Sequence, residues 1–220
     1  MFAAASLTAA FTDEKTTLAT SDSALKLEYS FAGSQALVQQ IQQGAPADVF
    51  ASASVKNMQT LVDAGLVEAP KTCARNPLEI AVAPGNPKHI TRLADLERSG
   101  VVLVLADPSV PAGNYAVQAF AKAGLPAPRA KSLELDVKAT LAKLTLGEAD
   151  AVVVYVTDVK AAGAKVQGVA IPDSQNVIAS YPIAVLKASK HLTAAEAFVD
   201  EIVSGTGRQA LQARGFLPPG

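Results

Sequence analysis

The stretch VKATLAKLTLGEADAVVVYV, residues 137–156, carries the pattern that decides the fold class. Its first half has the apolar spacing of an amphipathic helix and stops at Gly147, and its second half is a β-branched run over Ala151–Val156. A glycine just after a helix can adopt the left-handed conformation that closes the last turn. An apolar run without alternation is typical of a parallel strand covered on both faces. The stretch therefore predicts one helix–strand repeat of an α/β protein.

The same alternation of helix, glycine and strand continues through the rest of the chain. Helices are expected over Ser34–Gln43, Ser54–Ala64, Thr91–Ser99, Asn114–Ala123, Val137–Leu146, Thr193–Ser204 and Gly207–Arg214. The glycines that follow them are Gly44, Gly65, Gly100, Gly124, Gly147, Gly205 and Gly215. Strands are expected over Leu25–Phe31, Val49–Ala51, Leu78–Ala83, Val101–Ala106, Ala151–Val156, Val166–Ile171 and Ile178–Leu186. Thr193 and Glu196 have the spacing of a helix capping box.

The length of 220 residues admits one large domain or two modest lobes. No Pro/Gly/Ser-rich linker separates independent domains, so two lobes would be joined by short strands. The expected crossings lie near Cys73–Pro77 and Ile178–Pro182. This assigns residues 1–74 and 183–220 to the first lobe and residues 75–182 to the second.

Composition argues against several classes of protein. The 19 basic and 20 acidic side chains nearly cancel, whereas proteins that bind nucleic acid or anionic lipid in bulk carry an excess of Lys and Arg. His89 and His191 have no Cys, Asp or Glu at metal-ligand spacing, so no cation site made of side chains is expected. Cys73 is the single cysteine and excludes an internal disulfide. No secretory signal precedes the first strand, and no apolar run approaches the ~20 residues of a membrane span.

Small and hydroxyl residues occur where expected strands run into helices. Ser6 follows an apolar segment, Ser34 begins a helix, and the loop Pro108–Asn114 and the N-cap candidate Asp136 precede two more helices. The first turn of a helix carries unpaired amides and a partial positive charge, so several helix starts directed at one point form an anion site without any lysine. Tyr155 ends an expected strand; its ring either packs in the core or presents its hydroxyl as a further donor.

Seven blocks of the chain, in order, resemble the molybdate-binding solute receptors of ABC importers. The blocks are Phe2–Leu7 (FAAASL), Phe31–Ser34 (FAGS), Gln43–Ala53 (QGAPADVFASA), Ala74–Asn76 (ARN), Val110–Ala116 (VPAGNYA), Val154–Asp158 (VYVTD) and Tyr181–Val185 (YPIAV). The resemblance implies a two-lobed type II periplasmic-binding-protein fold, each lobe a mostly parallel sheet flanked by helices, with a hinged cleft that closes on a tetrahedral oxyanion.

The resemblance also implies a ligand set made only of uncharged donors. Carried over block by block, Ser6 and Ser34 donate from the first lobe, and the amides of Ala112 and Val137 and the hydroxyl of Tyr155 donate from the second. The implied ligand is molybdate or tungstate, with no cofactor. The implied partner is the membrane permease of an ABC importer, and the protein is expected to be monomeric and periplasmic or otherwise extracytoplasmic, with a possible lipid anchor.

Three alternatives stay open at the level of sequence. The chain could be the effector-sensing domain of a transcription regulator, although no helix-turn-helix motif is recognisable. It could be a receptor for another tetrahedral oxyanion, such as sulfate. It could also be an enzyme acting on a phosphorylated or sulfated substrate, although neither histidine lies in the blocks above and no general base is expected there.

Overall fold

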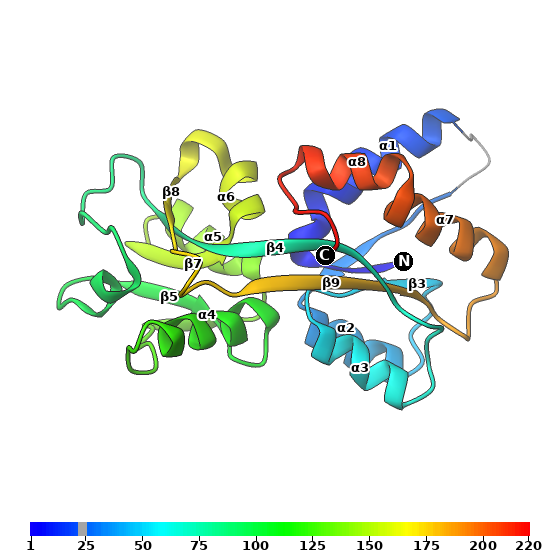
Figure 1. The fold of residues 1–220 in the computed structure, drawn as a ribbon, viewed down its shortest axis with the longest axis horizontal. Coiled ribbons are helices and arrows are strands. Elements are labelled where there is room, and N and C mark those ends of the chain that lie inside the picture. The colour runs from blue at the N-terminus through cyan, green and yellow to red at the C-terminus, as the bar shows by residue number, and fades with distance from the viewer. Residues whose placement is uncertain (22–25) are drawn as a thin grey trace. The chain divides into compact units, whose positions relative to one another are not determined.

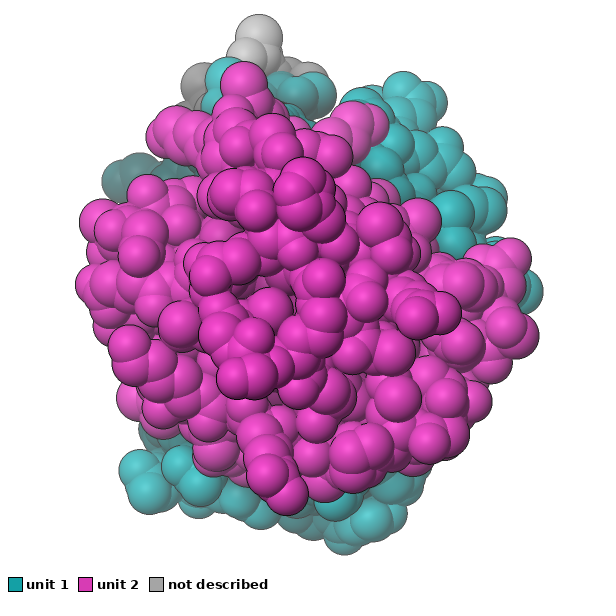
Figure 2. All heavy atoms as spheres, turned by 90° about the vertical axis from the view of Figure 1, so that its left-hand side faces the viewer, with its two compact units in different colours: residues 1–75, 180–220 teal, residues 76–179 magenta. Residues whose placement is uncertain are grey.

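The structure is a computed structural model that describes residues 1–21 and 26–220, without the side chains of residues 19–21. It divides into two compact units, coloured separately in Figure 2. Unit 1 comprises Met1–Arg75 and Ser180–Gly220, and unit 2 comprises Asn76–Ala179. Strands β4 (Lys71–Val82) and β9 (Ile178–Val185) contain the two points at which the chain passes between units. That these units are hinged lobes with the expected boundaries stays a prediction.

Unit 1 is built on a sheet in the order β2-β1-β3-β9 (Figure 1). Its strands β1 (Phe2–Ala4), β2 (Ser30–Ala32) and β3 (Val49–Ala51) are parallel, and β9 pairs antiparallel with β3. Its helical segments are η1 (Ala5–Leu7), α1 (Thr8–Ser21), α2 (Ser34–Gln42), α3 (Val55–Asp63), α7 (Leu192–Ser204) and α8 (Thr206–Ala213). Helices α2 and α3 bury Leu37, Ile41, Met58 and Leu61 in one core cluster with Phe50.

Unit 2 has a sheet in the order β4-β7-β5-β6, with β8 (Gln167–Ala170) pairing with β4. Strands β5 (Leu103–Ala106), β6 (Ser132–Glu134) and β7 (Ala151–Tyr155) are parallel. The helical segments are η2 (Leu93–Glu97), α4 (Pro111–Lys122), α5 (Val137–Thr145), α6 (Val156–Ala162) and η3 (Gly163–Lys165). Every residue of β5 and β7 is buried, as expected for apolar strands without alternation. The α/β class predicted from the sequence is therefore confirmed.

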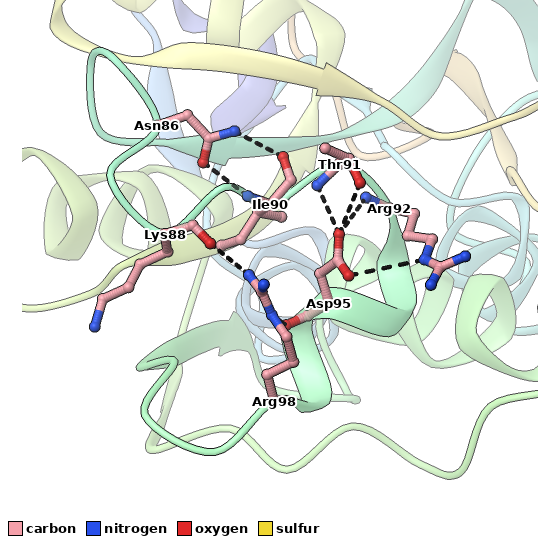
Figure 3. A network of polar contacts seen from close by, with 7 residues as sticks. All are labelled: Asn86, Lys88, Ile90, Thr91, Arg92, Asp95 and Arg98. Carbon is pink, nitrogen blue, oxygen red and sulfur yellow. Dashed lines mark hydrogen bonds and ion pairs between the residues drawn. The ribbon is translucent and has the colours of Figure 1, made fainter.

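The prediction of a helix over Thr91–Ser99 is wrong, because only the short 3₁₀ helix η2 forms there. Figure 3 shows the local hydrogen bonds that replace a longer helix. The Asp95 carboxylate accepts from the Thr91 amide at 2.8 Å and hydroxyl at 2.9 Å, and from the Arg92 amide at 3.2 Å. The Asn86 side chain brackets Ile90 by accepting from its amide and donating to its carbonyl. These side-chain bonds fix the residues before η2 outside a helix.

Most other elements form where the sequence predicts them, with ends shifted by a few residues. Six of the seven helix-ending glycines have a positive φ, but Gly205 has φ −96°, because it joins α7 directly to α8. The predicted capping box is also wrong: α7 begins at Leu192, and its N-cap His191 makes no side-chain capping bond. The strand expected over Leu25–Phe31 is found as Ser30–Ala32, and Leu25 lies outside the described residues.

Helix α6 and strand β6 were not among the expected elements. Among the residues that the structure describes, no helix combines the length and apolar character needed to cross a membrane.

Candidate anion site

The five residues predicted to bind an anion lie at the carboxyl ends of parallel strands. Ser6 follows β1 and Ser34 follows β2; in the register of these strands Ala4 faces Ala32, so both serines stand two residues beyond the same paired position. Val137 follows β6, and Tyr155 is the last residue of β7. Ligands of open α/β sheets bind outside the carboxyl ends of the strands, so each unit places its candidates at the edge suited to binding.

In unit 1, the Ser6 side chain is buried and hydrogen-bonded. Ser6 lies within η1, is 6% exposed, and its Oγ shares a hydrogen bond of 2.9 Å with the hydroxyl of Tyr181 from β9. The apolar run before Ser6 forms β1, and the small residues Ala3, Ala4 and Ala5 let the strand end lie deep in the unit. Ser6 is therefore held by a contact 175 residues away in the sequence.

Ser34 is the first residue of α2 and is 1% exposed. Its Oγ accepts a hydrogen bond of 3.0 Å from the backbone amide of Ala53, in the loop between β3 and α3. That loop is itself fixed, because Ser52 Oγ accepts from the Ser54 amide and donates to the Ser54 carbonyl. Since β1 lies between β2 and β3 in the sheet, the Ser34–Ala53 bond spans the end of the strand that carries Ser6. Unit 1 thus brings both predicted serines to one place.

In unit 2, the candidate donors are backbone amides at helix starts. Helix α4 begins with Pro111 after the N-cap Val110, which makes no side-chain capping bond, and Ala112 is the second helical residue, 1% exposed. The first-turn amides have no acceptor four residues back within the helix. Gly113 permits the tight approach of this turn to β5, because a Cβ there would lie 2.2 Å from the Asp107 carbonyl oxygen.

Helix α5 begins at Val137 with Asp136 as its N-cap, as the sequence predicts. The Asp136 carboxylate accepts from the amides of Lys138 and Ala139, both at 2.8 Å. The amide of Val137 is not one of those that Asp136 caps. It is therefore the first-turn donor of α5 that the cap leaves for another acceptor.

Tyr155 lies at the junction of β7 and α6, and its side chain is only 1% exposed. Its backbone amide donates to the Asp158 carboxylate at 3.1 Å. Burial raises the pKa of Asp158 to about 7, opposed by the hydrogen bond from Tyr155 and by attraction to Lys138, while repulsion from Asp136 raises it further. Asp158 is thus a buried carboxyl with a raised pKa, and one of its oxygens is already held by the amide at the start of α6.

The contacts of Tyr181 with Ser6 and of Ala53 with Ser34 were not predicted from the sequence. Tyr181 lies in the last of the quoted blocks, but nothing in its local pattern shows that it bonds to Ser6. The contact from the Ala53 amide to Ser34 is made by the backbone, so no side-chain pattern in the sequence indicates it. The run Ser52-Ala53-Ser54 directly after an apolar strand was the available signal, since small residues there allow close approach of backbone groups.

A cavity of about 1230 Å³ lies elsewhere in unit 1 and is lined by none of the five predicted residues. Two pairs of its polar groups bond to each other: Ser189 Oγ donates to Asp48 at 2.6 Å, and the Met1 ammonium donates to the Glu28 carbonyl at 2.8 Å. Among the described residues, no three His, Cys, Asp or Glu side chains gather in a way that could hold a metal ion.

A family model and a curated relative both match this chain over nearly its whole length. The family model of bacterial extracellular solute-binding proteins matches residues 1–217. The molybdate-binding protein ModA of Mycobacterium tuberculosis H37Rv is 39% identical over 220 residues, which cover 100% of this chain and 84% of the relative.

Two solved structures share the fold at low sequence identity. The periplasmic molybdate-binding protein of Azotobacter vinelandii has a TM-score of 0.87 at 18% identity, covering 100% of this chain and 98% of its own. The sulfate-binding protein SubI of M. tuberculosis H37Rv has a TM-score of 0.88 at 21% identity, covering 99% and 85%. Because the two TM-scores are nearly equal, the chain shares its α/β fold with both binding proteins, and the likeness does not choose between their anions.

Proposed function

This chain belongs to the family of bacterial extracellular solute-binding proteins, and we propose that it is a receptor that captures molybdate or tungstate outside the cytoplasm for an ABC importer. The observation that carries the proposal is the set of uncharged donors that each unit gathers at the carboxyl ends of its parallel strands. The 39% identity to a molybdate-binding protein over the whole chain supports molybdate as the anion.

We assign Ser6, Ser34, Ala112, Val137 and Tyr155 to the binding of one oxyanion. The two serine hydroxyls and the tyrosine hydroxyl donate through side chains, and Ala112 and Val137 donate through backbone amides. Hydrogen bonds from fixed neutral groups to a charged acceptor are stronger than neutral pairs, contributing about 1.5 to 3 kcal/mol each. Helix dipoles at the starts of α4 and α5 add a favourable field for a doubly negative ion.

Anion size gives the selectivity. Molybdate and tungstate have longer bonds to oxygen than sulfate, so donors spaced for the larger ions leave sulfate with unsatisfied groups. Because molybdate and tungstate are close in size, we expect nearly equal affinities for the two. A structural likeness to a sulfate-binding protein makes sulfate the natural competitor to test.

The role as a transport receptor implies a partner and excludes turnover. We expect the permease of an ABC importer to recognise the ligand-bound form and the chain to act as a monomer in the periplasm or at the cell surface. The buried carboxyl Asp158 does not favour an enzyme, because it is 5% exposed and its oxygen holds the first turn of α6. A receptor returns its ligand unchanged.

A thermal-shift panel with molybdate, tungstate, sulfate, phosphate and chromate tests the proposal. A ligand at 100 times its dissociation constant adds about 2.7 kcal/mol to the free energy of unfolding, which raises the melting temperature measurably. We expect comparable shifts with molybdate and tungstate and a smaller shift with sulfate. A larger shift with sulfate than with molybdate would overturn the assignment of the anion, and no shift with any oxyanion would overturn the receptor function.

A further inference from the structure

Tyr181 occupies a position from which it can control one of the proposed donors. Its side chain is fully buried in unit 1, and its ring packs edge-on against Phe216 at a centroid distance of 5.3 Å. Its carbonyl accepts from the Cys73 thiol at 3.2 Å, and burial raises the pKa of that thiol to about 12, so the thiol stays a neutral donor. The phenol is therefore anchored by its ring and its backbone, and its hydroxyl meets Ser6 Oγ at 2.9 Å.

We propose that Tyr181 is a positioning residue that donates its hydroxyl hydrogen to Ser6 and thereby leaves the Ser6 hydrogen for the bound oxyanion. This inference rests on the proposed function of Ser6 as an anion ligand. It adds to the five proposed ligands a residue that acts on the anion only through another side chain.

The direction of the hydrogen bond follows from the inventory of donors. A serine hydroxyl carries a single hydrogen, so a Ser6 that donated to Tyr181 would have none for the anion. A phenol is more acidic than an aliphatic alcohol and is the better donor of the two. An anion beside Ser6 reinforces this order, because each hydrogen bond in the chain from Tyr181 through Ser6 to the anion polarises the next.

Ser34 shows the same arrangement with a partner whose direction is unambiguous. The Ala53 amide can only donate, so Ser34 Oγ must accept, and the hydrogen of Ser34 is left for another acceptor. Both candidate serines of unit 1 are thus paired with a group that can occupy one of their lone pairs. Ser34 uses a backbone amide for this purpose, whereas Ser6 uses the side chain of Tyr181, which mutation can remove.

Tyr181→Phe removes the hydroxyl and keeps the ring packed on Phe216. We expect molybdate to bind about 3- to 10-fold more weakly to this variant by titration calorimetry, the effect of losing one hydrogen bond that orders a donor. Tyr29→Phe is the matched control: Tyr29 lies in the same unit, its ring stacks on Phe31, and its hydroxyl contacts no proposed ligand. This control should bind molybdate as the wild type does.

A double-mutant cycle separates positioning from a general structural effect. In a Ser6→Ala background, Tyr181→Phe should cause no further loss of affinity, because the residue it orients is gone. In a Ser34→Ala background it should cause its full loss. Equal losses in both backgrounds, or an unchanged affinity in Tyr181→Phe alone, would overturn the inference while leaving the proposed function intact.

Failure of the wild-type chain to bind molybdate would instead overturn the proposed function, and this inference with it. Should Tyr181→Phe not fold, 3-fluorotyrosine at position 181 supplies a second variant, since it keeps the hydroxyl and makes it a stronger donor. This variant should bind molybdate more tightly than the wild type. Equal or weaker binding by a folded fluorotyrosine protein would overturn the inference.

Discussion

Unit 1 and unit 2 offer an anion different kinds of donor. In unit 1 the candidates are two serine hydroxyls, each buried and bonded to a neighbour that holds its oxygen. In unit 2 they are chiefly backbone amides at the starts of α4 and α5, next to a tyrosine and a buried carboxyl, Asp158. As a result, side-chain substitution can remove a candidate donor from unit 1, whereas most candidate donors of unit 2 are part of the backbone.

The largest effect is expected where unit 2 keeps a carboxyl beside its donors. Asp158 has a pKa of about 7 in the folded protein because it is buried, against about 3.9 in an unfolded chain. The folded state therefore binds more protons than the unfolded state between these values, and the free energy of unfolding falls as pH rises from about 4 to 7. Above pH 7 the buried charge destabilises the protein fully.

Asp158→Asn imitates the protonated acid at every pH and can still accept from the Tyr155 amide. We expect the variant to match the wild type near pH 4 and to be more stable by about 2 to 4 kcal/mol at pH 8, since each pKa unit corresponds to about 1.4 kcal/mol. Urea unfolding at both pH values measures the difference. A stability difference that does not change with pH would show that folding does not raise the pKa of Asp158.

Ser34→Ala tests the hydroxyl donors of unit 1. It removes a donor to the anion, so we expect molybdate binding to weaken by about 1 to 3 kcal/mol, together with a loss of stability because the Ala53 amide loses its acceptor. Ser30→Ala is the control, since Ser30 is an exposed serine of β2 in the same unit. Calorimetric titration measures the affinity of both variants for molybdate. Equal affinities of Ser34→Ala and Ser30→Ala would show that Ser34 does not bind the anion.

Val137→Pro tests a backbone donor of unit 2 without disturbing its helix. Proline is favoured at the first helical position, and Asp136 before it has the extended conformation that a following proline requires, with φ −159° and ψ 170°. The substitution removes the amide hydrogen but also a buried side chain. Val137→Ala removes the side chain alone and keeps the amide.

We expect Val137→Pro to bind molybdate more weakly than Val137→Ala by about 1 kcal/mol. Titration of the two variants under the same conditions measures this difference. Identical affinities would mean that the amide of Val137 does not contact the anion and that unit 2 binds through other groups.

The α/β class and most elements could be predicted from the amino-acid sequence, because they depend on local pattern. Apolar runs such as Ala151–Tyr155 and the glycines after helices act within a few residues, and they predicted the parallel strands and helix ends closely. Prediction from local pattern was wrong where a side chain bonds to nearby backbone, as Asp95 does before η2. It was also wrong where one helix runs directly into the next, as at Gly205. It also passed over β6, a strand of three residues at the sheet edge.

The groups that hold the candidate donors could be identified only in the folded chain. The partners of Ser6 and Ser34 are 175 and 19 residues away in the sequence. Tyr181 lies within β9 and Ala53 follows β3, and the sheet order places each of these strands two positions from the strand that precedes the serine. The pKa of Asp158 likewise depends on burial, which its position in the VYVTD block does not reveal. Periodicity and turn residues encode local conformation, but the direction of a hydroxyl hydrogen and the charge of a buried acid depend on distant groups that only the folded chain brings into contact.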